Sequence, residues 1–223
     1  MITRGHYRGQ FDIQTSPYLG VNFFNKAFVF AGQGACHPNM FEASYKKFES
    51  IRQHFEITDR FCKNLNLPSP SQYITGDDPE TLNRVHLIKN LALYTAEVAI
   101  ARELVAQGII PSALAGHSFG EYAALTISGV IDFEVGLKCI LLREEACGAP
   151  NEIGGMVAVG VPRSRIETHL SGCEYFFANS NSPRQMVLSV PKAEILKVCE
   201  KLEKNSLAFI ILKQLAFPYH SPL

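Results

Sequence analysis

The stretch Gly116-His117-Ser118-Phe119-Gly120-Glu121 lies between a short apolar segment, 112–115, and a segment of helical character, 122–128. A serine in a Gly-x-Ser-x-Gly turn between a strand and a helix is typical of a nucleophile elbow. The turn is tight, so a β-carbon at either glycine position would clash. A chance match in a loop is the alternative, but the strand–turn–helix context favours a nucleophilic Ser118. The backbone N–H of Phe119 would then point at negative charge that develops beside it.

Segments around this turn alternate between strand and helix. The apolar run 27–31 is typical of a buried parallel strand and ends in Gly32-Gln33-Gly34. The pattern predicts a loop at 67–73 and helices at 39–55, 86–107 and 133–147. Strands that alternate with helices predict an α/β fold with a hydrolase-like parallel-sheet core.

After Gly154 the order of predicted elements changes to strand, helix, strand, strand, helix, strand. The strands are expected at 156–160, 174–178, 185–190 and 208–212, and the helices at 163–170 and 193–204. This βαββαβ order predicts a small ferredoxin-like lobe. We therefore expect a linker or strap at 1–26, a core at 27–153 and 214–223, and the lobe at 154–213. We also expect the C-terminal part of the core to be incomplete, because the chain stops soon after the lobe.

Composition narrows the class of protein. The 223 residues include 21 Lys+Arg and 21 Asp+Glu, a balance that gives no indication of a nucleic-acid partner or of a basic membrane-binding surface. The six cysteines form no C-x-x-C pair, which favours reduced thiols over disulfides or a metal site. No apolar run reaches membrane-spanning length and no signal peptide is visible. We expect a cytoplasmic protein that binds neither metal nor membrane.

A serine nucleophile needs a base and an oxyanion site. Among seven histidines, His220 is the candidate base because it follows the lobe, where the chain should return to the core; an uninvolved terminal histidine is the alternative. Gln33 is a candidate second oxyanion donor through its N–H, unless Gly32-Gln33-Gly34 is a plain turn. Arg143 borders the apolar face of its predicted helix. If it points into the site it would bind a carboxylate through two N–H groups, and otherwise it is solvated.

Taken together, these motifs resemble the acyltransferase family of malonyl-CoA:acyl carrier protein transacylases and of the acyltransferase domains in polyketide and fatty acid synthases. The segment 30–34 is similar to the family's F-P-G-Q-G, and 116–121 matches its G-H-S-x-G-E. Arg143 stands where the family has a carboxylate-binding arginine. The segments 154–159, 179–185 and 217–223 resemble the family's G-G-M-x-A-V, N-x-N-S-P-x-Q and H-A-F-H-S-P-L.

The resemblance implies transfer of a malonyl or related carboxyacyl group from coenzyme A to the phosphopantetheine thiol of an acyl carrier protein. Ser118 would form the acyl-enzyme with His220 as base, and the N–H groups of Gln33 and Phe119 would bind the oxyanion. Arg143, together with Asn90 and Tyr219, would bind the acyl group, and the bulk of Tyr219 favours malonyl over methylmalonyl. No cofactor is implied, because the coenzyme A thioester is itself the substrate.

The chain also departs from the family pattern. Ala31 replaces a proline, Cys36 replaces a glutamine, and Asn90 occupies the position of another glutamine. Two alternatives therefore stay open. One is an acyl hydrolase or serine esterase that acts on thioesters, which would not need Arg143. The other is a catalytically incompetent fragment.

Overall fold

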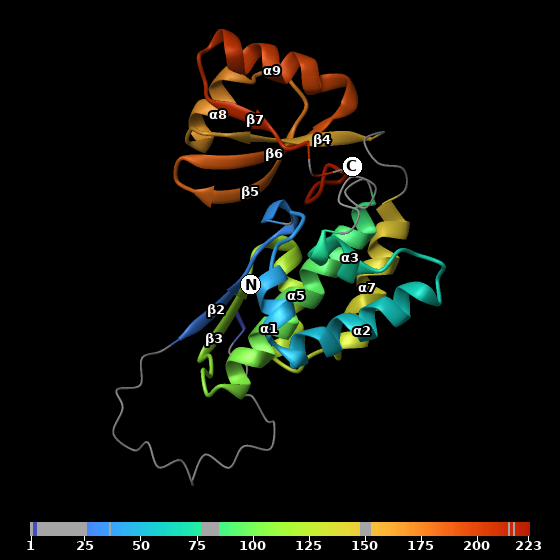
Figure 1. The fold of residues 1–223 in the computed structure, drawn as a ribbon. Helices are drawn as coiled ribbons and strands as arrows, with labels where there is room; N and C mark the ends of the chain where they lie inside the picture. The colour runs from blue at the N-terminus through green and yellow to red at the C-terminus, as the bar shows by residue number, and fades with distance from the viewer. Residues whose placement is uncertain are drawn as a thin grey trace, which may run out of the picture. The chain divides into compact units, whose positions relative to one another are not determined.

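The computed structural model of the chain describes residues 2–3, 26–35, 37–76, 85–147, 153–213, 215 and 217–223. The chain divides into two compact units, Met1–Glu144 and Glu145–Leu223, and the division falls in the last turn of helix α7 (Phe133–Cys147). Figure 1 shows the elements of each unit. The predicted linker at 1–26 lies outside the described residues except for Lys26 and a two-residue strand, β1 (Ile2–Thr3).

The first unit contains a sheet in the order β1-β3-β2. Strand β2 (Ala27–Phe30) runs parallel to β3 (Ala113–Gly116), as predicted, and β1 pairs with β3 in the antiparallel direction. The prediction that 27–31 is a buried strand is wrong for most of its length. In the described sheet β2 is an edge strand; Phe30 is buried, whereas Val29 is 74% exposed.

The long helix α5 (His86–Ala106) is the centre of the first unit. Its buried residues lie on every face, which is typical of a helix that neighbours surround on all sides. Helices α2 (Glu49–Lys63), α3 (Pro70–Thr75) and α6 (Glu121–Ile127) pack against it. Figure 1 shows α5 between α2 and the sheet. Helix α5 is therefore the centre of the hydrophobic core of the first unit.

Two helix predictions need correction. The single helix expected at 39–55 is two helices, α1 (Glu42–Lys47) and α2, separated by the extended backbone of Phe48, whose side chain packs against the core. The loop expected at 67–73 contains most of α3. This short helix forms because Pro70 occupies its first turn and because Asp59 on α2 accepts hydrogen bonds from the backbone N–H and hydroxyl of Ser71, at 3.1 and 2.6 Å.

The second unit has the predicted ferredoxin-like order of elements. Its sheet runs β5-β6-β4-β7 with every neighbouring pair antiparallel, and two helices follow the first and third strands. The elements are β4 (Gly154–Val159), α8 (Arg163–His169), β5 (Phe176–Ser182), β6 (Gln185–Pro191), a short 3-10 helix η4 (Lys192–Glu194), α9 (Ile195–Lys204) and β7 (Phe209–Ile211). Strand β5 is longer than predicted, because the pairing of β5 with β6 continues to Ser182 and Gln185. The α/β class and the ferredoxin-like lobe are thus confirmed.

Candidate active site

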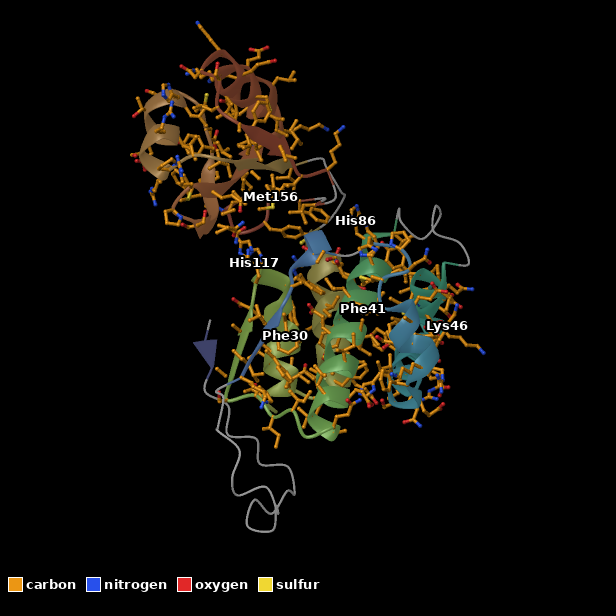
Figure 2. All side chains as sticks on the ribbon, turned by 60° about the vertical axis from the view of Figure 1, so that its left-hand side comes forward. Phe30, Phe41, Lys46, His86, His117 and Met156 are labelled. Atoms are coloured by element: carbon orange, nitrogen blue, oxygen red, sulfur yellow. The ribbon has the colours of Figure 1, made fainter. Side chains whose placement is uncertain are left out.

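Ser118 lies in the turn that joins β3 to α6. Strand β3 ends at Gly116, and a 3-10 turn, η3 (Ser118–Gly120), leads directly into α6. The His117 N–H donates to the Phe30 carbonyl at 2.9 Å, which ties the start of the turn to β2. Figure 2 labels Phe30 on β2 and His117 at the end of β3. The backbone of Ser118 is left-handed, with φ of 53°, which is the strained conformation expected of a nucleophile in a strand-to-helix turn.

The glycines on either side of Ser118 are required by close backbone contacts. A β-carbon on Gly116 would lie 2.3 Å from the Glu121 nitrogen, and one on Gly120 would lie 2.4 Å from the Phe30 carbonyl oxygen. Real β-carbons do not approach backbone atoms so closely. The sequence prediction of a turn without room for side chains is therefore confirmed at both positions.

Gln33 occupies a second turn that contacts the first. A 3-10 turn, η2 (Gln33–Ala35), follows β2 and packs against η3. Gly32, just before this turn, lies close to His117: a β-carbon there would lie 2.9 Å from the His117 side-chain Nδ1 and 3.0 Å from its carbonyl oxygen. The backbone N–H groups of Gln33 and Phe119 therefore belong to two touching turns. Their role as oxyanion donors stays a prediction.

Arg143 on α7 turns toward the two turns. Its side chain is 21% exposed, and its guanidinium carbon lies 5.7 Å from the centre of the Phe119 ring. One guanidinium nitrogen (Nη2) donates to the side-chain oxygen of Gln33 at 3.3 Å. A cation is thus placed beside the residue that follows Ser118. Its role as a carboxylate-binding group stays a prediction.

Glu144 is a feature that the sequence analysis missed. Its carboxylate oxygen Oε1 accepts a hydrogen bond from Nη1 of Arg143 at 2.7 Å and another from the Asn90 amide at 2.7 Å. Asn90 is buried, and the Glu144 side chain is only 9% exposed. Burial raises the pKa of Glu144, while Arg143 and the Asn90 hydrogen bond oppose that rise. Neighbours along a helix do not normally face each other, so no sequence pattern predicts a pairing of residues 143 and 144.

Glu97 is a second buried carboxyl group that the sequence analysis missed, and it bonds to the backbone at position 31. The N–H of Ala31, which proline would lack, donates to Oε1 of Glu97 on α5 at 2.6 Å. Within the described part of the chain the other carboxyl oxygen of Glu97 is buried without a hydrogen-bond partner. Burial raises the pKa of Glu97 to about 8. The Gln33 turn is thus anchored to the central helix by a buried carboxyl group.

The candidate base, His220, lies in the second unit, on the segment 217–223, which is held by hydrogen bonds and a ring contact. The buried Ser189 hydroxyl donates to the Tyr219 carbonyl, and the Ser221 hydroxyl donates to the Pro218 carbonyl at 2.6 Å. The ring of Tyr219 packs edge-on against buried Phe217, with ring centres 5.6 Å apart. These contacts group 217–223 with the second unit, whereas the sequence analysis assigned them to the core. His220 is exposed, with φ of 57°; its action on Ser118 and the contact of Tyr219 with an acyl group stay predictions.

The described residues include neither a metal-binding cluster nor a membrane-spanning helix. No cluster of three or more His, Cys, Asp or Glu side chains in that part of the chain is arranged to hold a metal ion. None of its helices combines the length and apolar character needed to cross a membrane.

The left-handed turn at Ser118, the Gln33 turn that packs against it and the arginine beside both form one candidate site. Residues 27–222 match the model of the acyl transferase domain family, and the chain belongs to that family. Among curated proteins it is 33% identical over 199 residues to the non-reducing polyketide synthase fsr1 of Gibberella fujikuroi. It is 34% identical over 201 residues to the bikaverin polyketide synthase bik1 of the same fungus. Each alignment covers 87% of this chain, and 8% and 10% of those proteins.

Solved structures agree with this assignment. The malonyl CoA-acyl carrier protein transacylase of Clostridium perfringens matches with 30% identity and a TM-score of 0.74, covering 89% of this chain and 63% of that one. A malonyl-transacylase solved with its type II polyketide synthase acyl carrier protein matches with 27% identity and a TM-score of 0.75, over 89% of this chain and 65% of that one. The chain therefore spans about a tenth of the curated synthases and just under two thirds of these transacylases.

Proposed function

We propose that this chain is an acyltransferase that moves a malonyl group from coenzyme A, through an ester on Ser118, to the phosphopantetheine thiol of an acyl carrier protein. The observation that carries the proposal is the position of Arg143. A guanidinium held by the Gln33 side chain and the Phe119 ring lies next to the nucleophile turn. A hydrolase of neutral acyl groups has no need of a cation there.

The first half of the reaction forms the acyl-enzyme. The Ser118 hydroxyl oxygen attacks the thioester carbonyl carbon while its proton passes to the imidazole of His220. The N–H groups of Gln33 and Phe119 stabilise the oxyanion of the tetrahedral intermediate. The intermediate collapses, the carbon–sulfur bond breaks, and the leaving coenzyme A sulfur takes the proton from His220.

The second half repeats these steps in reverse. The phosphopantetheine thiol of the carrier protein gives its proton to His220 and attacks the ester carbonyl. The bond to Ser118 breaks, and the serine oxygen recovers the proton. Coenzyme A thioester and carrier protein are both substrates in this scheme, and no bound cofactor takes part.

Selection of the acyl group belongs to three side chains. The guanidinium of Arg143 suits a carboxylate because its N–H groups can bind both oxygens of a carboxylate. Asn90 is linked to Arg143 through Glu144, whose carboxylate accepts a hydrogen bond from each of them. Tyr219 would limit room for an α-methyl branch and so favour malonyl over methylmalonyl. The proposed carrier-protein partner is supported by the relative that was solved in complex with one. A cytoplasmic location fits both substrates.

A transfer assay tests the proposal. The chain is incubated with malonyl-CoA and a phosphopantetheinylated carrier protein from a type II polyketide synthase, and intact-mass spectrometry follows the carrier. We expect malonyl on the carrier with the native chain. With Arg143→Ala, the initial transfer rate should fall by about 10²-fold, because each charge-assisted contact in such a site is worth a few kcal/mol. Release of free malonic acid at the same rate without carrier would favour the hydrolase instead.

A further inference from the structure

The arginine proposed to bind the substrate's carboxylate already has a carboxylate beside it. Nη1 of Arg143 lies 2.7 Å from Oε1 of Glu144, and Nη2 lies 3.3 Å from the Gln33 side-chain oxygen. One charged and one neutral acceptor of its own unit are therefore among the contacts of the guanidinium. An incoming carboxylate would meet a pair with no net charge instead of an isolated cation.

The surroundings of this pair make the competition matter. The side chains of Arg143 and Glu144 are 21% and 9% exposed, so solvent screens their interaction weakly. Asn90 donates a second hydrogen bond to the same oxygen of Glu144. A buried carboxylate that accepts two such bonds is held in place, because removing it from its donors leaves a desolvated charge.

We propose that Glu144 is a specificity-determining residue, an internal counter-ion that competes with the substrate's carboxylate for Arg143. It lowers the preference of the site for carboxyacyl over neutral acyl thioesters. This inference rests on the proposed function, since it takes Arg143 as the carboxylate-binding group. Asn90 then acts indirectly: it is a positioning residue that holds Glu144 against Arg143.

The substitution Glu144→Gln isolates the charge. Glutamine is almost the same shape, and its amide oxygen can still accept hydrogen bonds from Asn90 and Arg143. Only the competing negative charge is lost. Glu145→Gln is the matched control, because it removes the same charge one position further along α7, where the side chain is exposed.

Binding is measured in the full chain with Ser118→Ala, so that no acyl-enzyme forms. Isothermal titration calorimetry gives Kd for malonyl-CoA and for acetyl-CoA. With Glu144→Gln we expect Kd for malonyl-CoA to fall by about tenfold or more while Kd for acetyl-CoA changes by less than about twofold, since like charges placed together at a binding site are strongly unfavourable. Glu145→Gln should leave both constants within about twofold of the parent.

An unchanged ratio of the two constants, weaker malonyl-CoA binding, or no measurable malonyl-CoA binding by the Glu144→Gln variant would each overturn the inference. Circular dichroism of every variant shows whether the fold is kept, and Glu144→Ala provides a second neutral substitution if the glutamine variant does not fold. Failure of the proposed function is a separate result. Absence of acyl transfer by the native chain, together with the expected change in Kd, leaves the competition intact and removes only the transferase activity.

Discussion

Gly116 and Gly120 lie so close to neighbouring backbone atoms that neither position can carry a side chain. Gly120 packs against the carbonyl oxygens of Phe30 and Ala31, so the Ser118 turn is in close backbone contact with the end of strand β2. Its φ of −60° is open to any residue, which means that space alone excludes a side chain there. Glycine is therefore required at position 120 by close packing and not by the backbone conformation.

We expect Gly120→Ala to lower the free energy of unfolding of the first unit by at least about 2 kcal/mol, since the new methyl group must displace backbone atoms. Urea denaturation followed by circular dichroism measures the change. The control is Gly160→Ala, where the β-carbon would meet Ala208 at an ordinary 3.5 Å, and there the cost should stay within about 0.5 kcal/mol. Equal effects of the two substitutions would contradict this close backbone contact.

Glu97 makes the stability of the first unit depend on pH. Its pKa is raised by burial from 4.5 to about 8, so between these values the folded chain keeps a proton that the unfolded chain has lost. The free energy of unfolding must then decrease as pH rises through this window, by up to about 1.4 kcal/mol per pH unit. The stabilisation by the protonated Glu97 is fully present below pH 4.5, and it is lost as the pH rises to about 8 and above.

The substitution Glu97→Gln tests this, because its amide oxygen can still accept the Ala31 N–H. Urea denaturation at about pH 5 and about pH 8 should show a smaller decrease in stability for the variant than for the native chain. The variant should also be the more stable of the two at the higher pH. A native chain whose stability does not change between these pH values would contradict a buried, neutral Glu97.

Helices α5 and α7 approach closely at a glycine. A β-carbon on Gly136 would lie 2.0 Å from the Tyr94 hydroxyl oxygen. That hydroxyl donates to the Phe133 carbonyl at 3.1 Å and bonds to the Thr126 hydroxyl at 2.7 Å, so it joins α5 to both α6 and α7. The Tyr94 and Phe133 rings stack with centres 5.3 Å apart.

We expect Gly136→Ala to destabilise the first unit by about 2–3 kcal/mol, because the methyl group pushes away a buried, hydrogen-bonded hydroxyl. Adding Tyr94→Phe removes the hydroxyl that clashes and should restore part of the loss. A double-mutant cycle measured by thermal or urea unfolding gives the coupling. Simple addition of the two single effects would show that the helices do not meet as described.

The strand–turn–helix around Ser118 was predicted from the sequence to within a residue. The prediction succeeded because the glycines and the apolar periodicity that determine it lie close together in the sequence. The βαββαβ order of the second unit was also predicted, although the bounds of strands such as β5 were not. The break at Phe48 and the helix α3 were missed because they depend on contacts with the core and with Asp59 on another helix.

The candidate site shows the same division. Ser118, Gln33 and Arg143 follow from motifs, and the structure places the last two in contact. Glu144 follows from no motif, because its partners are a helix neighbour and a residue 54 positions away. Glu97 was missed for the same reason, since Ala31 lies 66 positions before it. Long-range polar contacts of this kind become visible only in the folded chain.

Across the whole molecule, the first unit carries Ser118, Gln33, Asn90 and Arg143, and the second carries Tyr219 and His220. The proposed reaction requires groups from both. The acyl-enzyme is its common intermediate, whatever the final acceptor. Formation of that ester is therefore the central claim.

The most direct test is intact-mass spectrometry of the chain after brief incubation with malonyl-CoA, followed by peptide mapping of the modified residue. The account predicts the mass of one added malonyl group, located on Ser118 and absent from the Ser118→Ala variant. An unmodified native chain, or a malonyl group that persists in the Ser118→Ala variant, would contradict it.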